Sequence, residues 1–154
     1  MATINATVSV NSNDLTSNAL SLSKTMTLTK AGSNVGLELT SGLVRRTFTS
    51  TNHVDLVTAG AQNYGTPTAT KANKIYIKNT GSDSTQYFEV GLGTSSGSGT
   101  PTTDAIGGAH LAIGRLYGGD WMLIPFDGSA TTGDITVAPS TSEKMTVEYI
   151  IFFE

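Results

Sequence analysis

The sequence IGRLYGGDWMLIPF, residues 113–126, places eight large apolar side chains around one Gly-Gly-Asp turn. Apolar runs on both sides of a glycine turn predict two consecutive β-strands. In the second run both alternating sets of side chains are apolar, so we expect that strand to be covered on both faces. Trp121 is therefore expected in a core or an interface, rather than on a sugar-binding platform.

The sequence MTVEYIIFFE, residues 145–154, predicts a second apolar strand. One of its faces is apolar throughout, and the other begins polar and becomes apolar at Ile150 and Phe152. Leaving such a side chain in water forgoes roughly 1.5–3 kcal/mol relative to burial. Exposed apolar strands also invite aggregation. We therefore predict an interface, with another subunit or with a partner protein, that includes Trp121, Ile150, Phe152 and Phe153.

The rest of the chain is rich in Thr, Ser, Gly and Asn, and no segment has the apolar spacing of an amphipathic helix. The spacing of the predicted strands favours a single all-β domain, a jelly-roll-like β-sandwich of about eight or nine antiparallel strands over residues 19–154. Residues 1–18 contain sparse apolar groups and are expected to form an N-terminal arm. The strands are predicted at residues 19–30, 42–51, 53–59, 73–80, 84–93, 109–117, 120–126, 133–138 and 143–153.

The composition excludes several classes of protein. The chain has 154 residues, which fits one domain, and no cysteine, which excludes disulfides and thiolate sites. His53 and His110 are too few for a histidine-rich zinc site. A net charge of -3 lacks the basic surplus of nucleic-acid binders. With neither a signal-peptide pattern nor an apolar run of about 20 residues, we expect a protein made in a cytoplasm, without membrane or direct nucleic-acid contact.

The charges are distributed unevenly along the chain. Residues 1–78 carry seven basic and three acidic side chains, a net charge of +4, whereas residues 79–154 carry two basic and nine acidic ones, a net charge of -7. The two halves either interleave in the fold or form separate basic and acidic surfaces. We favour interleaving, because halves of a sequence seldom form separate faces of an antiparallel sheet.

Residues capable of catalysis are not arranged as in known sites. Ser98 lies in GTSSGSG, which lacks the strand-to-helix turn that exposes a nucleophile. Asp120, Asp127 and Asp134 are spaced seven residues apart, which is compatible with calcium binding, but each lies in an evident turn where Asp caps the backbone. We therefore predict no catalytic residue, metal site or cofactor, and a protein that is not an enzyme.

Four segments of the C-terminal half resemble a known family of proteins: NKIYIKNTGS, IGRLYGGDWMLIPFDGS, DITVA and MTVEYIIFFE. They are similar to small structural proteins in the virions of tailed bacteriophages. In those proteins a strand ending in KNTG precedes a hairpin of the type L-x-x-G-[DE]-x-x-x-I-P, and the chain ends on a strand with Val-Glu-Tyr and a final Phe-Glu. The matching residues are Leu116, Gly119, Asp120, Ile124, Pro125, Val147, Glu148, Tyr149, Phe153 and Glu154.

The resemblance implies a role in particle architecture. We expect a capsid decoration (cement) protein that forms a homo-oligomer, a trimer, and binds the major capsid protein on the capsid surface. The first alternative is a tail, baseplate or fibre protein of the same kind of virion. The second is a carbohydrate-binding module that uses Trp121, Tyr117 or Tyr64.

Overall fold

The structure is a computed structural model that describes residues 4–14, 20–28, 39–58, 72–93, 111–127 and 134–153. All of its regular elements are β-strands, and every pair of strands is antiparallel. Within these ranges no helix is long and apolar enough to cross a membrane. The chain forms two compact units, Met1–Glu38 and Leu39–Phe153. The prediction of an all-β protein is confirmed.

The N-terminal unit contains one β-hairpin. Strand β1 (Ile4–Ser12) pairs along its whole length with β2 (Leu20–Leu28). The predicted arm, residues 1–18, therefore contains one strand of a hairpin, β1, and the division between the two units lies after Glu38 rather than after residue 18. The reason is that the strand predicted at residues 19–30 pairs with β1 and belongs to neither sheet of the sandwich.

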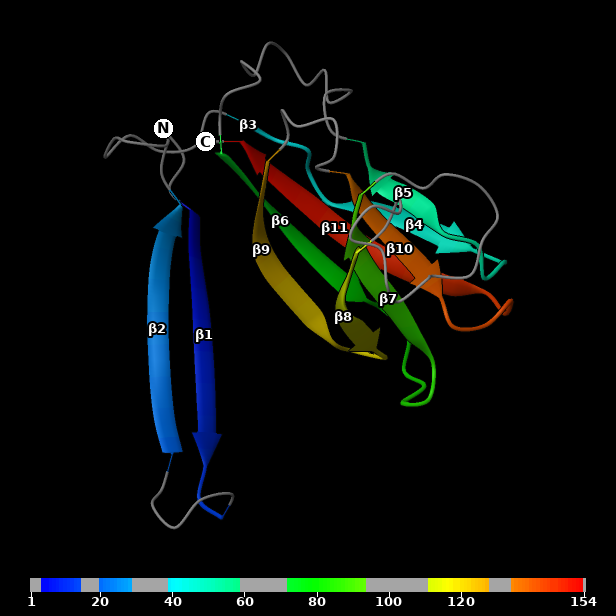
Figure 1. Ribbon diagram of the computed structural model, residues 1–154. Coiled ribbons are helices and arrows are strands. Elements are labelled where there is room, and N and C mark those ends of the chain that lie inside the picture. Colours follow the sequence, from blue (N-terminus) through cyan, green and yellow to red (C-terminus); the bar gives the residue numbers. More distant parts are fainter. Residues whose placement is uncertain are drawn as a thin grey trace. The chain divides into compact units, whose positions relative to one another are not determined.

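The second unit contains two sheets (Figure 1). The larger sheet has the order β3-β11-β6-β9, and β4 also pairs with β11. The smaller sheet has the order β5-β10-β7-β8. The larger sheet consists of β3 (Leu39–Thr40), β4 (Val44–Phe48), β6 (Ala72–Asn79), β9 (Trp121–Asp127) and β11 (Met145–Phe153). The smaller sheet consists of β5 (Val54–Val57), β7 (Tyr87–Leu92), β8 (Leu111–Tyr117) and β10 (Ile135–Pro139).

The core lies between the two sheets, and both supply it with alternate side chains. Phe48 of β4 meets Phe88 of β7 edge to face, with ring centroids 5.6 Å apart, a favourable arrangement for two aromatic rings. The burial of β11 alternates from Met145 to Ile151, which places one set of its side chains inward. The buried cluster includes Ile75, Ile77, Val90, Leu116, Ile135, Val137, Met145, Val147, Tyr149, Ile151 and Phe153.

The two halves of the chain interleave, as the charge argument predicted. Strand β11, from the acidic half, lies between β4 and β6, from the basic half. Arg45 of β4 forms an ion pair with Glu148 of β11. The opposite charges of the two halves are therefore mixed within the larger sheet.

His53, which precedes β5, is buried and makes the stability of the fold depend on pH. Burial lowers the pKa of its imidazole, and the Glu89 carboxylate opposes this shift. As the pH falls below the unfolded value of about 6.5, the unfolded chain binds the proton first. Stability that is fully present above that pH is therefore lost as the pH falls through the lower pKa of the folded state.

We expect the urea midpoint of unfolding to fall between about pH 7.5 and about pH 5.5, and to fall less in the His53→Gln variant. Both proteins keep His110, so the titration of that residue cancels in the comparison. Equal falls in the two proteins would contradict the assignment of this pH dependence to His53.

Candidate interaction surface

The larger sheet carries a row of apolar side chains on its outer face, opposite the core. The register places Tyr76 of β6 between Ile150 of β11 and Leu123 of β9. Side chains directly opposite one another in antiparallel strands point to the same face and touch. All three are half-buried within the single chain. They form the centre of a flat apolar surface that solvent still reaches.

Trp121, at the start of β9, extends this row. Its ring lies 5.9 Å from that of Tyr76 at an interplanar angle of 35°, and 48% of the residue is exposed. The expectation that this strand is covered on both faces is therefore wrong at Trp121 within one chain. β9 is the last strand of its sheet, so Trp121 has a neighbouring strand on one side only. We call Tyr76, Trp121, Leu123 and Ile150 the aromatic patch.

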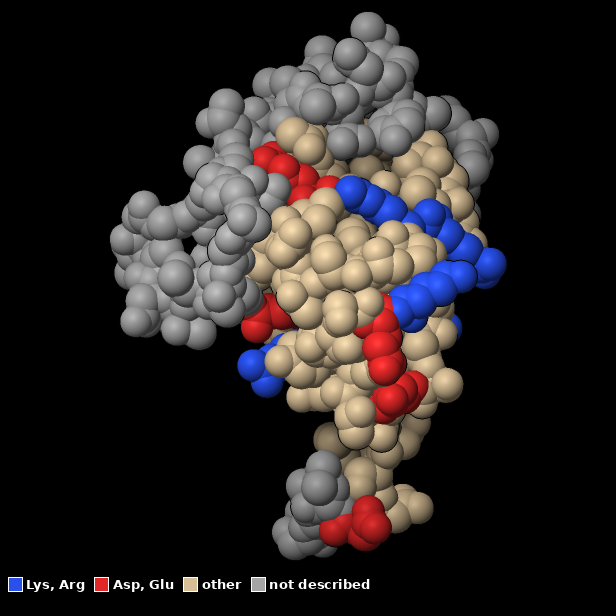
Figure 2. Space-filling model, turned by 90° about the vertical axis from the view of Figure 1, so that its right-hand side faces the viewer, with Lys and Arg blue, Asp and Glu red and all other residues tan. Residues whose placement is uncertain are grey.

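Cationic side chains lie next to the aromatic patch. Lys78 stands between Glu148 and Trp121 in the register, and Lys74 stands between Phe152 and Pro125. Arg45 lies beyond Glu148 and is largely exposed. Among the side chains that the structure describes, this face therefore carries three cations and one carboxylate. Figure 2, another view of the molecule, shows Lys and Arg side chains as a band, with Asp and Glu side chains next to it.

Two titratable groups at the aromatic patch are partly withdrawn from water. Burial lowers the pKa of Lys74. Burial first, and the Glu148 carboxylate second, raise the pKa of Tyr76. Both shifts arise because the apolar surroundings disfavour the charged form. A partner that covers this face would therefore meet side chains that have already lost part of their hydration.

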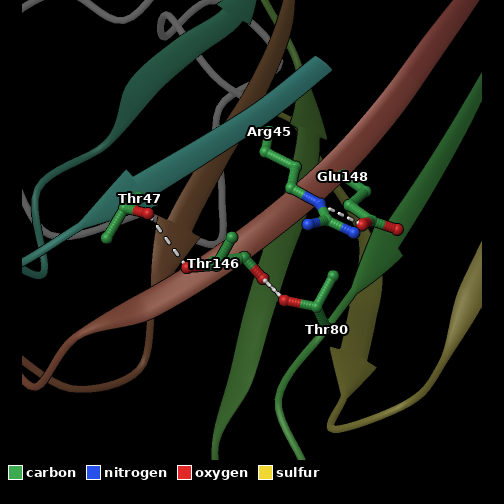
Figure 3. Close-up of polar contacts among 5 residues, drawn as sticks. All are labelled: Arg45, Thr47, Thr80, Thr146 and Glu148. Atoms are coloured by element: carbon green, nitrogen blue, oxygen red, sulfur yellow. Dashed lines mark hydrogen bonds and ion pairs between the residues drawn. The ribbon is translucent and has the colours of Figure 1, made fainter. Parts of the chain in front are cut away.

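Toward one end of the larger sheet, the polar groups form hydrogen bonds and an ion pair with one another (Figure 3). The hydroxyl groups of Thr47 and Thr146 share a hydrogen bond of 3.0 Å, and the Thr80 hydroxyl donates to the Thr146 carbonyl oxygen at 2.9 Å. The Arg45 guanidinium donates to the Glu148 carboxylate beside them. These polar groups border the aromatic patch and leave few unsatisfied atoms for a ligand.

The residues predicted for the interface fall into two groups. Trp121 is exposed and Ile150 is half-buried, so both reach the surface. Phe153 is 1% exposed and belongs to the core, and Phe152 is 8% exposed although it is on the outer face. Phe152 is buried because β11 is a central strand, with Thr40 and Lys74 opposite it on either side. Neither phenylalanine needs a second copy for its burial.

A buried asparagine fixes the turn that precedes Trp121, and the sequence analysis did not single it out. The Asn79 amide donates to the Leu116 carbonyl oxygen at 3.0 Å, and its side-chain oxygen accepts from the Gly81 N–H at 2.9 Å. The backbone of Asn79 also bonds to Gly119 and to the Asp120 carbonyl oxygen. The KNTG and LYGGD segments, both part of the bacteriophage-like pattern, thus meet at Asn79. We call this set of hydrogen bonds among Asn79, Gly81, Leu116, Gly119 and Asp120 the joint.

The smaller sheet exposes Leu111 and Ile113 of β8, and the rest of its outer face combines charged groups with aromatic rings. Arg115 lies over the Tyr87 ring, 4.5 Å from its centroid, and its Nε is 3.8 Å from a Glu89 carboxylate oxygen. The Tyr87 and Tyr117 rings are 5.3 Å apart. The charged groups and aromatic rings on this face already contact one another. The aromatic patch on the larger sheet is therefore the better candidate for binding a partner.

Within the described ranges, no three histidine or acidic side chains are grouped as metal ligands. Asp120 acts in a turn, where its carboxylate accepts from the Tyr117 N–H at 3.0 Å. A shallow polar pocket of about 190 Å³ lies beside Asn79, Asp83, Lys144 and Thr146. Ser98 lies outside the described residues, as does the side chain of Asp127.

Comparison with protein families, with curated proteins and with solved structures finds no match to this chain.

Proposed function

We propose that this chain is a virion structural protein that decorates the outer surface of a bacteriophage capsid and stabilises the head as a homo-oligomer, a trimer. The observation that carries the proposal is the aromatic patch, which has an apolar centre and a rim of Arg45, Lys74 and Lys78. Protein interfaces combine a desolvated centre, often aromatic, with a polar rim. The sequence resemblance to virion proteins supports the same conclusion.

The strand order also supports it. We assign the sandwich to the jelly-roll type, because its strands are ordered β4-β11-β6-β9 and β5-β10-β7-β8. In this order every consecutive pair of strands from β4 onward changes sheet except β7 and β8, as expected of two interlocked Greek keys. Jelly rolls occur in viral capsid proteins and in lectins. Because one fold hosts several functions, the surface chemistry has to decide between them.

The proposed role is mechanical. An oligomer that holds neighbouring subunits of the major capsid protein would resist the outward pressure of packaged DNA. The aromatic patch would supply contact area, and its surplus of cations would orient the protein toward an acidic surface of the shell. We expect the carboxylate of Glu148, which is already paired with Arg45, to contribute little to this attraction.

Binding to capsids tests both the function and the surface. Particles of the virus that encodes this chain, prepared without it, should co-sediment with the purified protein at micromolar concentration. The Trp121→Ala variant should bind at least about 30-fold more weakly, because exposed aromatic anchors contribute about 2 kcal/mol or more to such interfaces. The measurement is the bound fraction as a function of protein concentration.

Leu111→Ala provides the matched control, since Leu111 is an exposed apolar residue of the smaller sheet. It should bind as the wild type does. Failure of the wild-type protein to co-sediment contradicts the proposed function. Normal binding by Trp121→Ala, with the wild type bound, contradicts only the assignment of the surface.

A tail, baseplate or fibre location would use the same surface against a different partner. Electron microscopy of virions in which this protein is labelled distinguishes the two sites, because a decoration protein covers the capsid and a tail component does not.

The exposed Trp121–Tyr76 pair also keeps the carbohydrate-binding alternative open. Aromatic rings that solvent can reach, with a polar group such as Lys78 beside them, are suited to stacking on a sugar. A glycan array, and a shift of Trp fluorescence on adding sugar, would identify this activity. Binding to glycans without binding to capsids would favour it over decoration.

A further inference from the structure

One face of the N-terminal hairpin is polar, and its side chains form hydrogen bonds with one another across the two strands. On that face Asn5 is paired with Thr27, Thr7 with Thr25 and Asn11 with Ser21, and each pair shares a side-chain hydrogen bond of 2.9–3.0 Å. Cross-strand pairs of this kind satisfy the polar groups of a sheet surface that faces water. The polar face of the hairpin therefore needs no partner.

The opposite face of the hairpin is apolar, and neither of its two strands covers it. Five of its side chains are 39–45% exposed: Val8, Val10, Leu20, Leu22 and Met26. An isolated two-stranded hairpin is at best marginally stable in water. A hairpin with so many exposed aliphatic side chains requires a second apolar surface on this face.

Lys24 determines how that surface can approach. It lies opposite Val8 in the middle of the apolar face and is the only charged residue on this face within the two described strands. A lysine on the inner face of an edge strand blocks continued edge-to-edge addition of strands. Its long stem can still lie along apolar neighbours while the ammonium group reaches water past the free edge of β2. Packing through the face is therefore favoured over pairing through the edge.

The size of the face indicates what covers it. Each strand has nine residues, so the hairpin presents a surface about 30 Å long and about 10 Å wide, or about 300 Å². A stable complex between two different proteins usually buries about 800 Å² on each partner. A face of this size binds too weakly to form a complex alone. It can contribute a stable contact when the same chains already associate through another surface, because the second contact then forms within one assembly.

We infer that the apolar face of the hairpin packs against the same face of hairpins from other copies of this chain. In a cyclic trimer the three equivalent faces meet around the threefold axis, where their side chains interdigitate as in other sheet-to-sheet contacts. The aliphatic face carries no carboxylate or aromatic group that would select a different partner. This inference rests on the homo-oligomer of the proposed function, and it assigns the contact to the hairpin.

Site-specific cross-linking tests the contact. Because the chain has no cysteine, a single cysteine can be placed on either face with little disturbance. Val10→Cys places a thiol on the apolar face, and Asn11→Cys, the next residue along the same strand, places one on the polar face. A short bismaleimide should join Val10→Cys chains into covalent dimers and leave Asn11→Cys chains largely single.

The strength of association provides the second measurement. In sedimentation equilibrium of the full chain, the double variant Val10→Ser, Leu22→Ser should associate at least about tenfold more weakly than the wild type. The matched control is Ser9→Ala, Ser23→Ala, which alters an opposite pair on the polar face and should associate normally.

Equal cross-linking from the two faces, or unchanged association of the apolar-face double variant, overturns the inference. So does a wild-type chain that remains monomeric at all concentrations. A monomeric wild-type chain would also contradict the trimer of the proposed function, whereas the first two failures leave that function standing, because capsid co-sedimentation is measured separately.

Discussion

Replacing Asn79 with leucine is expected to lower the free energy of unfolding of the sandwich by about 2–5 kcal/mol. Asn79 is 1% exposed, and its side chain joins the end of β6 to the carbonyl oxygen of Leu116 on β8 and to the N–H of Gly81. Leucine has a similar size but can neither donate nor accept a hydrogen bond. Each buried polar group left without a partner costs about 1–3 kcal/mol, and this change leaves two.

Urea denaturation followed by Trp fluorescence measures the effect, because Trp121 adjoins the same joint. Asn52→Leu is the matched control, since Asn52 is exposed, and it should change the stability by less than about 0.5 kcal/mol. Similar stabilities for the two variants would show that the joint contributes little to the fold.

The fold was largely predictable because its strands alternate with a period of two. The predicted strand at residues 143–153, for example, agrees with β11 (Met145–Phe153), whose inward set is buried throughout. The strand at Ile4–Ser12 also alternates, with Ile4, Ala6, Val8 and Val10 on one face, but it was not predicted because the apolar groups of residues 1–18 were judged too sparse. Its pairing with β2 provides the support that this strand does not find in its own composition.

The candidate surface was predicted only in part. Sequence alternation places Ile150 and Phe152 on the same face of β11, but it does not reveal that Phe152 is flanked on both sides whereas Trp121 lies on an edge strand. Exposure depends on sheet order, which the sequence analysis left open. The contact of Asn79 with Leu116 was also hidden, because 37 residues separate them.

Gly118 is expected to tolerate no side chain, although its backbone angle is not the reason. A Cβ atom at this position would lie 2.6 Å from the Asp83 carbonyl oxygen, 2.9 Å from the Asp83 nitrogen and 3.0 Å from the Gly81 carbonyl oxygen. All three are backbone atoms, which cannot rotate away as a side chain can. Gly118→Ala must therefore push the turn after β8 away from the turn after β6.

We expect Gly118→Ala to lower the free energy of unfolding by about 3 kcal/mol, at the upper end of the usual range for overpacking. Gly114→Ala, four residues earlier in β8, is the matched control, because a Cβ there meets nothing within 4 Å. That change should alter the stability by less than about 1 kcal/mol, since it mainly reduces the freedom of the unfolded chain. Urea denaturation measures the free energy of unfolding of both variants. Equal stabilities would show that the turn after β8 can move away from the turn after β6 at little cost. If it cannot, the close approach of these turns requires glycine at position 118 and fixes where β9, and with it Trp121, begins.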